Sequence, residues 1–390
     1  MYSERMGNVK SSAIRDILKL MARPGMISFA GGLPAPELFP VKEIAASADA
    51  VLKKYGATTL QYSVTEGIMP LREKIAKMLG PDKKQLTVEN VIITHGSQQA
   101  LDLLSKVFID NGSPVITENP SYLGALQSFQ LFQAKLLAVP SDGSGINTSL
   151  LRDRLKKEKP RFVYLMPNFQ NPTGLSYSLE RRKELAALAR EYDVIIVEDD
   201  PYGALRFEGE RMPSIFSLTK GGNVVYLSTF SKTIAPGLRV AYVAGDADLL
   251  KKLVIAKQGT DLQTNTFGQY IVNEYLESGH YQKHIDMVTQ TYRERRDVML
   301  AALERLFPKS VSWNKPSGGM FFWVRLPDGA DAGVILNKCI EHNVAFVPGV
   351  EFYPDGSGKN TMRLNFTNAT ATDIEQGIKR LAEVLKENGL

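Results

Sequence analysis

The strongest constraint on the fold is an alternation of short apolar runs with helical patterns through the middle of the chain. The runs are continuous and rich in β-branched residues, and they lie at residues 91–94, 114–117, 162–166, 194–197, 224–227 and 240–243. Strands that are buried on both faces of a mainly parallel sheet have this composition. Helical patterns such as 98–108 and 179–191 separate them, and Ser178 is the expected cap of the second. The alternation predicts an α/β fold with a doubly wound sheet.

The chain has 390 residues, which is enough for two domains. We expect a large α/β domain at residues 45–285. A long helical pattern at 267–306, broken near Gly279, then leads into expected strands at 320–324 and 363–366 and expected helices at 332–342 and 372–386. These elements indicate a smaller α+β domain at 286–390. Residues 1–44 are too few to fold alone and are expected to pack on it.

Composition argues against several classes of protein. The chain is 44% hydrophobic and 23% charged, as is usual for soluble globular proteins. No apolar run approaches the roughly 18 residues of a membrane helix, and the N-terminus lacks the apolar core of a secretory signal. Cys339, the one cysteine, fits a reducing compartment and a packed core thiol. We therefore expect a cytoplasmic protein that does not bind membranes.

The charge distribution gives no indication of a nucleic-acid partner. The net charge is +5, which is modest for this length. The densest basic stretch, residues 293–296, lies in a helical pattern and is interrupted by Glu294. This favours a solvated helix face over a nucleic-acid groove.

Lys232 lies in a group of hydroxyl residues shortly before Arg239. A lysine amine condenses with an aldehyde to form a Schiff base. The hydroxyls of Thr229 and Ser231 and the guanidinium of Arg239 are suited to hold a phosphate beside it. An aldehyde together with a phosphate describes pyridoxal 5′-phosphate. The alternative is a serine-rich turn that carries a solvated lysine.

A second candidate phosphate site follows the expected strand at 91–94. Gly96, Ser97 and Gln98 lead directly into a helix, whose first N–H groups lack internal partners and favour an anion. Ser97 and Gln98 add side-chain donors. The same residues are also compatible with an ordinary N-cap.

Two further groups of polar residues lie at the carboxyl ends of expected strands, where ligands of open α/β sheets collect. Asn171 begins an Asn-Pro-Thr-Gly turn and offers an amide to a phenolic oxygen, although a simple surface turn is the favoured explanation when the motif is taken in isolation. Asp199 follows the strand at 194–197, and its carboxylate would suit a protonated pyridine nitrogen. Tyr202, three residues on, could reach the ring oxygen.

Metal sites are weaker interpretations of the same sequence. Glu198, Asp199 and Asp200 resemble a Mg²⁺ site, but no Walker-type phosphate loop accompanies them. His280 and His284 have helical spacing without the glutamate of a zinc hydrolase motif. We expect no metal ion in the site.

Taken in order, these motifs resemble the pyridoxal-phosphate-dependent aminotransferases of fold type I, classes I and II. The matching motifs are Gly-Ser-Gln at 96–98, Asn-Pro-Ser-Tyr at 119–122, Asn-Pro-Thr-Gly at 171–174, Asp-x-x-Tyr at 199–202, Ser-Lys at 231–232 and Arg-Leu-Asn-Phe at 363–366. Together they cover essentially the whole chain. Residues 12–15, 27–37 and 60–67 look most like the 2-aminoadipate and kynurenine aminotransferase branch.

The resemblance implies a role for each cofactor contact. Lys232 carries the cofactor covalently and moves a proton at the substrate Cα, while Asp199 pairs with the ring nitrogen. Asn171 and Tyr202 bind the ring oxygen, and Tyr122 stacks on the ring. The implied phosphate ligands are Ser97, Gln98, Thr229, Ser231 and Arg239. Thr229 stands where related enzymes usually carry a serine.

The resemblance also implies the substrate contacts and a partner. Arg363 would bind the substrate α-carboxylate beside Asn171 and Gly32, and Arg15 would pair with a distal carboxylate. The alternative for Arg15 is a helix-surface arginine. Tyr62 would reach the phosphate of a second subunit, so a homodimer with shared active sites is expected.

The expected reaction is amino-group transfer between an L-amino acid and a 2-oxo acid such as 2-oxoglutarate, by a ping-pong mechanism. Candidate donors are 2-aminoadipate, glutamate, and aromatic or branched aliphatic amino acids. Alternatives are another fold type I reaction, such as a β-lyase or decarboxylase reaction, or a pyridoxal-phosphate-binding regulatory sensor. The family pattern begins within about 15 residues of the first residue, so we expect no DNA-binding module before it.

Overall fold

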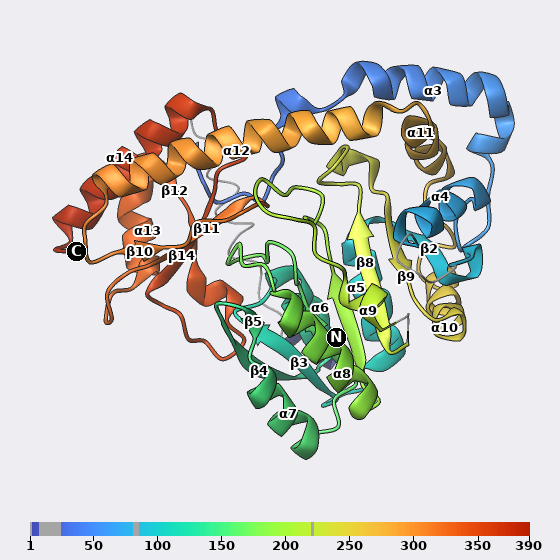
Figure 1. Cartoon of the computed structure of the whole chain (residues 1–390), viewed down its shortest axis with the longest axis horizontal. Coiled ribbons are helices and arrows are strands. Elements are labelled where there is room, and N and C mark those ends of the chain that lie inside the picture. The colour runs from blue at the N-terminus through green and yellow to red at the C-terminus, as the bar shows by residue number, and fades with distance from the viewer. Residues whose placement is uncertain (1, 8–24, 81–85, 220–221) are drawn as a thin grey trace.

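The computed structural model describes residues 2–7, 25–80, 86–219 and 222–390. Figure 1 shows an α/β part around a central sheet and a C-terminal part with its own strands and helices. The long helix α12 (His280–Leu306) runs from the first part to the second.

The central sheet has eight strands in the order β2-β9-β8-β7-β6-β3-β4-β5. Their bounds are β2 (Val91–Thr94), β3 (Pro114–Asn119), β4 (Lys135–Asp142), β5 (Gly145–Ile146), β6 (Phe162–Leu165), β7 (Ile195–Asp199), β8 (Val224–Thr229) and β9 (Ala241–Ala244). The pairs from β4 through β3, β6 and β7 to β8 are all parallel. Strand β9 runs antiparallel to both β2 and β8. The predicted mainly parallel sheet is therefore confirmed.

The sheet has apolar residues on both faces, as its composition predicts. Along β8, Val225 and Leu227 pack in one hydrophobic cluster, whereas Val224 and Tyr226 pack in the other. Successive side chains of a strand point to opposite faces, so one short run supplies both clusters. The helices packed around the sheet are α4 (Met69–Leu79), α5 (Gly96–Phe108), α6 (Leu123–Leu131), α7 (Thr148–Lys157), α8 (Leu179–Glu191), α9 (Ile215–Leu218), α10 (Ala247–Gln258) and α11 (Thr266–Glu277).

Local signals explain where two of the helices begin. Helix α8 begins after Ser178, whose hydroxyl accepts a hydrogen bond from Arg181 N at 3.1 Å, as expected for an N-cap. Helices α11 and α12 are separated near Gly279, which has a φ of 76°. That left-handed conformation is inexpensive for glycine, so the break lies where the sequence predicts it.

The C-terminal part contains an antiparallel sheet in the order β10-β11-β14-β13. Its strands and helices are β10 (Ser312–Trp313), β11 (Phe321–Arg325), β13 (Val347–Pro348), β14 (Thr361–Asn365), α13 (Ala332–Glu341) and α14 (Ala371–Glu387). The remaining elements are α1 (Glu4–Gly7), α3 (Val41–Tyr55), β1 (Ile27–Ser28), β12 (Val344–Ala345), η1 (Pro36–Leu38), η2 (Gly56–Leu60), η3 (Val88–Asn90), η4 (Pro236–Leu238) and η5 (Gly349–Phe352).

An N-terminal segment joins this C-terminal part. Strand β1 pairs with β12 in parallel, and Phe29 N donates to Ala345 O at 2.8 Å. Asn365 N in turn donates to Phe29 O at 2.8 Å. Helix α14 lies over the Phe29 ring at Gly377, where an added Cβ would come within 2.5 Å of the ring. The segment is therefore held by backbone hydrogen bonds and by close packing at one glycine.

This packing predicts the effect of Gly377→Ala. In an exposed helix the change would stabilise by about 0.5–1 kcal/mol, but here the new methyl overlaps the Phe29 ring. We expect the free energy of unfolding to fall by about 1–3 kcal/mol, measured by denaturant unfolding. Gln376→Ala, at the exposed neighbour, is the control and should change stability by less than about 0.5 kcal/mol. A stabilised Gly377→Ala variant would contradict the account.

Candidate active site

The carboxyl ends of β6, β7 and β8 and the turn after β2 meet at one cavity of about 610 Å³. This is the edge at which open α/β sheets bind ligands. The predicted site residues that line it are Gly32, Ser97, Gln98, Tyr122, Asn171, Asp199, Tyr202, Thr229, Ser231, Lys232, Arg239 and Arg363. Tyr62 lies outside the cavity and is 79% exposed. Arg15 lies outside the described residues.

Lys232 follows β8, and its amine reaches across the cavity to the N-terminal segment. Its Nζ donates to Gly32 O at 2.8 Å. Burial, together with the positive charges of Arg363 and Arg239, lowers the pKa of Lys232 to about 8. The uncharged amine is the form that attacks a carbonyl, so this environment makes it accessible near neutral pH.

Asp199 ends β7 and is almost completely buried. Its Oδ2 accepts a hydrogen bond from Tyr164 Oη at 2.7 Å, whereas Oδ1 has no partner among the described residues. Burial raises the pKa of Asp199 to about 7, with the Tyr164 hydrogen bond opposing that rise and the charge of Asp200 adding to it. A buried carboxylate with a free oxygen calls for a cationic or donor partner. A protonated ring nitrogen would meet that need.

Tyr164 is a part of the site that the sequence analysis did not identify. It lies within β6, whose residues the sequence predicts only as a buried strand. In the parallel register Tyr164 pairs with Val197, two residues before Asp199. Residues two apart share a face of a strand, so a correct register would have placed the tyrosine beside the carboxylate.

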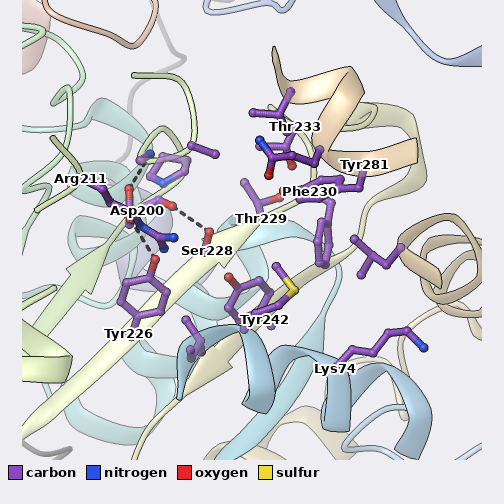
Figure 2. Close-up of a pocket in the computed structure, with 18 of the residues that line it drawn as sticks. Lys74, Asp200, Arg211, Tyr226, Ser228, Thr229, Phe230, Thr233, Tyr242 and Tyr281 are labelled. Atoms are coloured by element: carbon purple, nitrogen blue, oxygen red, sulfur yellow. Dashed lines mark hydrogen bonds between the residues drawn. The ribbon is translucent and has the colours of Figure 1, made fainter. Parts of the chain in front are cut away.

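The three neighbouring carboxylates point in different directions. Glu198 accepts hydrogen bonds from Ile215 N at 3.0 Å and Phe216 N at 2.8 Å. Asp200 accepts from Tyr226 Oη at 2.9 Å and lies at a second cavity, of about 650 Å³ (Figure 2). Because only Asp199 of the three lines the first cavity, they do not form the Mg²⁺ cluster that their adjacency suggested. In the described parts of the chain, no group of His, Cys, Asp and Glu is arranged to hold a metal ion.

The predicted phosphate ligands converge at the start of α5. Gly96 has a φ of +75°, and an added Cβ would lie 2.1 Å from Arg239 Nη2, so this position requires glycine. Ser97 Oγ is buried without a hydrogen-bond partner among the described residues. Thr229 Oγ1 donates to Ser231 Oγ at 3.0 Å. Three hydroxyls, a guanidinium and a helix N-terminus thus surround a position suited to an anion.

Arg363 connects the C-terminal part to the rest of the site. Its Nη1 donates to Asn171 Oδ1 at 2.7 Å and its Nη2 to Ala30 O at 2.6 Å, while Nε is buried without a partner among the described residues. The guanidinium lies 4.4 Å from the centre of the Phe321 ring and 5.0 Å from that of Phe352. Burial lowers the pKa of Arg363 to about 10. The side chain remains a cation that can bind a carboxylate.

The two aromatic candidates lie in the same cavity. Tyr202 packs edge-on against Phe321 with ring centroids 5.9 Å apart, and burial raises its pKa above the ordinary tyrosine value. Tyr122 is the residue immediately before α6, and burial raises its pKa as well. Both hydroxyls therefore stay protonated near neutral pH and can donate hydrogen bonds.

The residues fit pyridoxal 5′-phosphate. One carboxylate oxygen of Asp199 has no partner among the described residues and can bind a cation. The Lys232 amine has a lowered pKa and can react with an aldehyde. The Ser97 hydroxyl is also unpartnered among the described residues, and it lies at the N-terminus of α5. The Arg363 guanidinium provides a second anion-binding group in the cavity, for a substrate carboxylate. These groups match the ring nitrogen, the aldehyde and the phosphate of the cofactor and the carboxylate of an amino acid.

The environment of Lys232 predicts the pH dependence of its reaction with pyridoxal in cofactor-free protein. The rate, followed by absorbance, should rise with pH around a midpoint of about 8. In Arg363→Met one neighbouring cation is lost, protonation of Lys232 becomes easier, and the midpoint should move to higher pH. Arg325→Met, at an exposed arginine of β11, is the control and should leave it unchanged. A wild-type midpoint near the ordinary lysine value of 10.5 would contradict the assignment.

Comparisons with known proteins agree with this geometry. Residues 24–381 match the family described as aminotransferase class I and II. An aromatic-amino-acid aminotransferase from Thermococcus litoralis is 46% identical, over 99% of this chain and 94% of the relative.

Two solved structures have the same fold throughout. The alpha-aminoadipate aminotransferase of Thermus thermophilus, complexed with N-(5′-phosphopyridoxyl)-L-leucine, has a TM-score of 0.93 and 44% identity, covering 99% of this chain and 97% of that one. The kynurenine aminotransferase of Pyrococcus horikoshii has a TM-score of 0.95 and 45% identity, covering 100% and 97%. The chain therefore belongs to the class I and II aminotransferases, and it is a pyridoxal-phosphate-dependent enzyme of fold type I.

Proposed function

We propose that this aminotransferase moves an amino group between 2-aminoadipate or glutamate and a 2-oxo acid such as 2-oxoglutarate. Aromatic and branched aliphatic amino acids are further proposed donors. The proposal rests mainly on the position of Arg363. This buried cation lines the same cavity as Lys232, and its Nε–H has no partner among the described residues. The named activities of the relatives, on aromatic amino acids, alpha-aminoadipate and kynurenine, support this choice of substrates.

Each site residue has a proposed task in the reaction. When bound, pyridoxal phosphate supplies the electron sink that makes removal of an α-proton feasible. Arg363 binds the α-carboxylate and so fixes the orientation of Cα. Lys232 Nζ takes the proton from the substrate Cα and would deliver it to the cofactor carbon C4′, which its lowered pKa permits. Asp199 Oδ1, which is unpartnered among the described residues, would accept a hydrogen bond from the ring nitrogen and favour its protonated form.

The proposed cofactor contacts follow from the lining of the cavity. Asn171 accepts from Arg363 through Oδ1, which leaves its amide NH₂ group to donate to the ring oxygen together with the Tyr202 hydroxyl. Tyr122 would stack on the ring. The proposed phosphate ligands are Ser97, Gln98, Thr229, Ser231 and Arg239.

The active unit is proposed to be a homodimer. Tyr62 is too exposed to serve its own cavity, and its neighbours Leu60 and Val64 are also exposed, at 72% and 54%. Ser63 N donates to the side chain of Gln263, so the segment is tied to the residues before α11. Leu262 adds a further exposed apolar side chain at 57%. Such a patch is typical of a protein interface, and we assign Tyr62 to the phosphate of the partner subunit.

The proposal also includes the division into domains and the cellular compartment. Residues 45–285 are proposed to form the large domain and 286–390 the small one, which residues 27–29 join through β1. The short helix α1 does not pack there as expected, because the Arg5 guanidinium lies 5.9 Å from the centre of the Phe132 ring of the large domain. In the portions of the chain that the structure describes, none of the helices is both long and apolar enough to cross a membrane. We place the enzyme in the cytoplasm.

A half-reaction screen tests the substrates. Purified enzyme loaded with pyridoxal phosphate is mixed with single amino acids, and conversion to the pyridoxamine form is followed by absorbance. We expect 2-aminoadipate and glutamate to react, and 2-oxoglutarate to restore the starting spectrum. Release of carbon dioxide or elimination products without this conversion would favour a decarboxylase or β-lyase instead.

The same screen tests Arg15. In Arg15→Ala the preference for 2-aminoadipate over leucine should fall about tenfold, as expected when a charge-assisted hydrogen bond is lost. Arg154→Ala, an exposed arginine of α7, is the control. An unchanged preference in Arg15→Ala would reject the role of Arg15 and leave the transfer reaction standing.

A further inference from the structure

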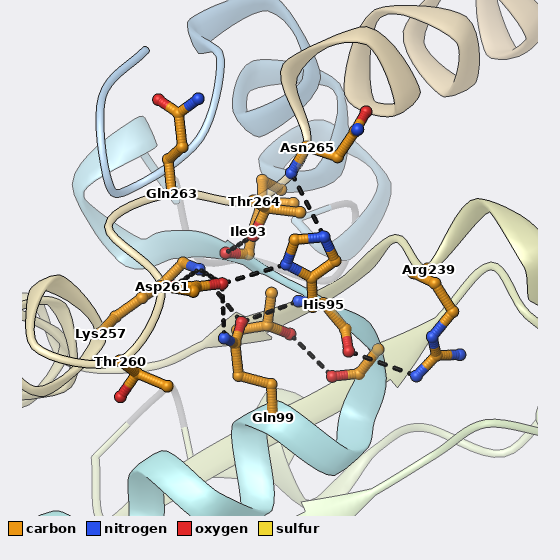
Figure 3. Close-up of polar contacts among 12 residues, drawn as sticks. Ile93, His95, Gln99, Arg239, Lys257, Thr260, Asp261, Gln263, Thr264 and Asn265 are labelled. Carbon is orange, nitrogen blue, oxygen red and sulfur yellow. Dashed lines mark hydrogen bonds and ion pairs between the residues drawn. The ribbon is translucent and has the colours of Figure 1, made fainter. Parts of the chain in front are cut away.

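Four polar side chains form a connected cluster directly behind the phosphate-binding turn (Figure 3). At its centre is Lys257, near the end of α10, whose side chain is 0% exposed. Its Nζ lies 2.7 Å and 2.9 Å from the two carboxylate oxygens of Asp261 and donates to Gln99 Oε1 at 3.1 Å. A lysine this deeply buried requires a charged partner, and Asp261 supplies it.

The cluster continues to His95, the residue before Gly96. Gln99 Nε2 donates to Asp261 Oδ2 at 2.6 Å, and Gln99 Oε1 accepts from His95 N at 2.8 Å. His95 Nδ1 lies 3.0 Å from Asp261 Oδ2, while Nε2 accepts from Asn265 N at 3.5 Å. This pattern selects the tautomer in which Nδ1 carries the proton and donates to the carboxylate.

Both carboxylate oxygens of Asp261 thus accept hydrogen bonds, which stabilise its negative charge. Burial alone would raise the pKa of Asp261, but hydrogen bonds from Lys257, Gln99 and His95 outweigh burial and lower it. For Lys257, burial lowers the pKa and the contact with Asp261 opposes that change. The pair holds the imidazole and the amide of its two neighbours in fixed orientations.

Two contacts connect the cluster to the phosphate ligands. His95 O accepts from Arg239 Nη2 at 3.3 Å. His95 also immediately precedes Gly96, the residue that cannot carry a Cβ beside Arg239. A displaced His95 would therefore move the start of α5 and one end of the Arg239 guanidinium together. Lys257, Asp261, His95 and Gln99 themselves do not line the cavity.

We propose that the Lys257–Asp261 ion pair positions the phosphate-binding groups, by orienting His95 and Gln99 behind the Gly96–Ser97 turn. These are positioning residues, because none of them lines the cavity. The proposal rests on the assignment of this turn to the cofactor phosphate. The ion pair affects recognition of the phosphate, whereas Lys232 is held by Gly32 and Asp199 by Tyr164.

The test compares two ligands that differ only in the phosphate. Pyridoxal 5′-phosphate and pyridoxal are titrated into cofactor-free protein, and the absorbance of the covalent lysine adduct gives each dissociation constant. Asp261→Asn alone would leave Lys257 buried without its charge and could prevent folding. The main variant is therefore Lys257→Met combined with Asp261→Leu, because replacing both members of a buried pair with apolar residues is often neutral for stability.

We expect the double variant to bind pyridoxal 5′-phosphate about tenfold more weakly, the loss expected for a weakened charge-assisted contact. Pyridoxal affinity should stay within about twofold, because Lys232 and Asp199 are untouched. Gln99→Met keeps the ion pair intact and should show the same selective loss, which keeps the proposal testable if the double variant does not fold. Asp102→Asn removes the partly exposed Lys106–Asp102 pair of α5 and should change neither constant.

Two results would overturn the proposal: unchanged affinity for both ligands, or an equal loss for both, which would indicate a general structural role. The outcome is independent of the substrate assignment. If wild-type protein binds the cofactor but transfers no amino group from 2-aminoadipate or glutamate, the proposed function fails while the ligand comparison remains valid.

Discussion

A carboxylate buried at the end of β7 is the constraint on which the site depends. Asp199 has one oxygen satisfied by Tyr164 and the other unpartnered among the described residues, in a position almost closed to solvent. Such a group is costly to bury unless a cation or donor meets it. In the same cavity, burial and the charges of Arg363 and Arg239 lower the pKa of Lys232. One cavity therefore holds a carboxylate with a free oxygen, two guanidinium cations and a reactive amine.

This arrangement follows from the topology of the sheet. Parallel strands end at a common edge, so residues far apart in sequence meet there without any local signal. Asn171 follows β6, Asp199 ends β7 and Lys232 follows β8, while the turn at Gly96 follows β2. Arg363 lies on β14 of the antiparallel sheet in the C-terminal part, and its Nη1 donates to Asn171 Oδ1 at 2.7 Å. Its position ties the substrate site to the packing of the C-terminal part against the rest of the fold.

Much of this could be predicted from the sequence, because buried parallel strands and helix ends leave local signals. The bounds of β2 and α8 agree with the predicted ranges, and the break at Gly279 follows from one left-handed glycine. The sequence does not predict strand β4, because its apolar run at 136–139 contains a single β-branched residue and is followed directly by proline. The sequence also does not predict the antiparallel direction of β9, because its composition is the same as that of the parallel strands of the sheet.

Some of the site residues could likewise be predicted from the sequence, and others could not. Residues in motifs, such as Ser97, Asn171 and Lys232, stand out because polar groups follow apolar strands. Tyr164 and the cluster around Lys257 do not, because their roles depend on strand register and on the contact of Gln99 in α5 with Asp261 after α10. A buried lysine in a helix resembles a surface lysine in sequence. Only its 0% exposed side chain reveals the requirement for Asp261.

The central claim is that the free carboxylate oxygen of Asp199 keeps the ring nitrogen of the cofactor protonated. The most direct test is the rate of the glutamate half-reaction in Asp199→Asn protein saturated with pyridoxal phosphate, with cofactor binding measured in parallel. Our account predicts that the variant still binds the cofactor through its phosphate contacts, while the rate falls by about a hundredfold to a thousandfold. A variant that binds the cofactor and reacts at the wild-type rate would contradict it.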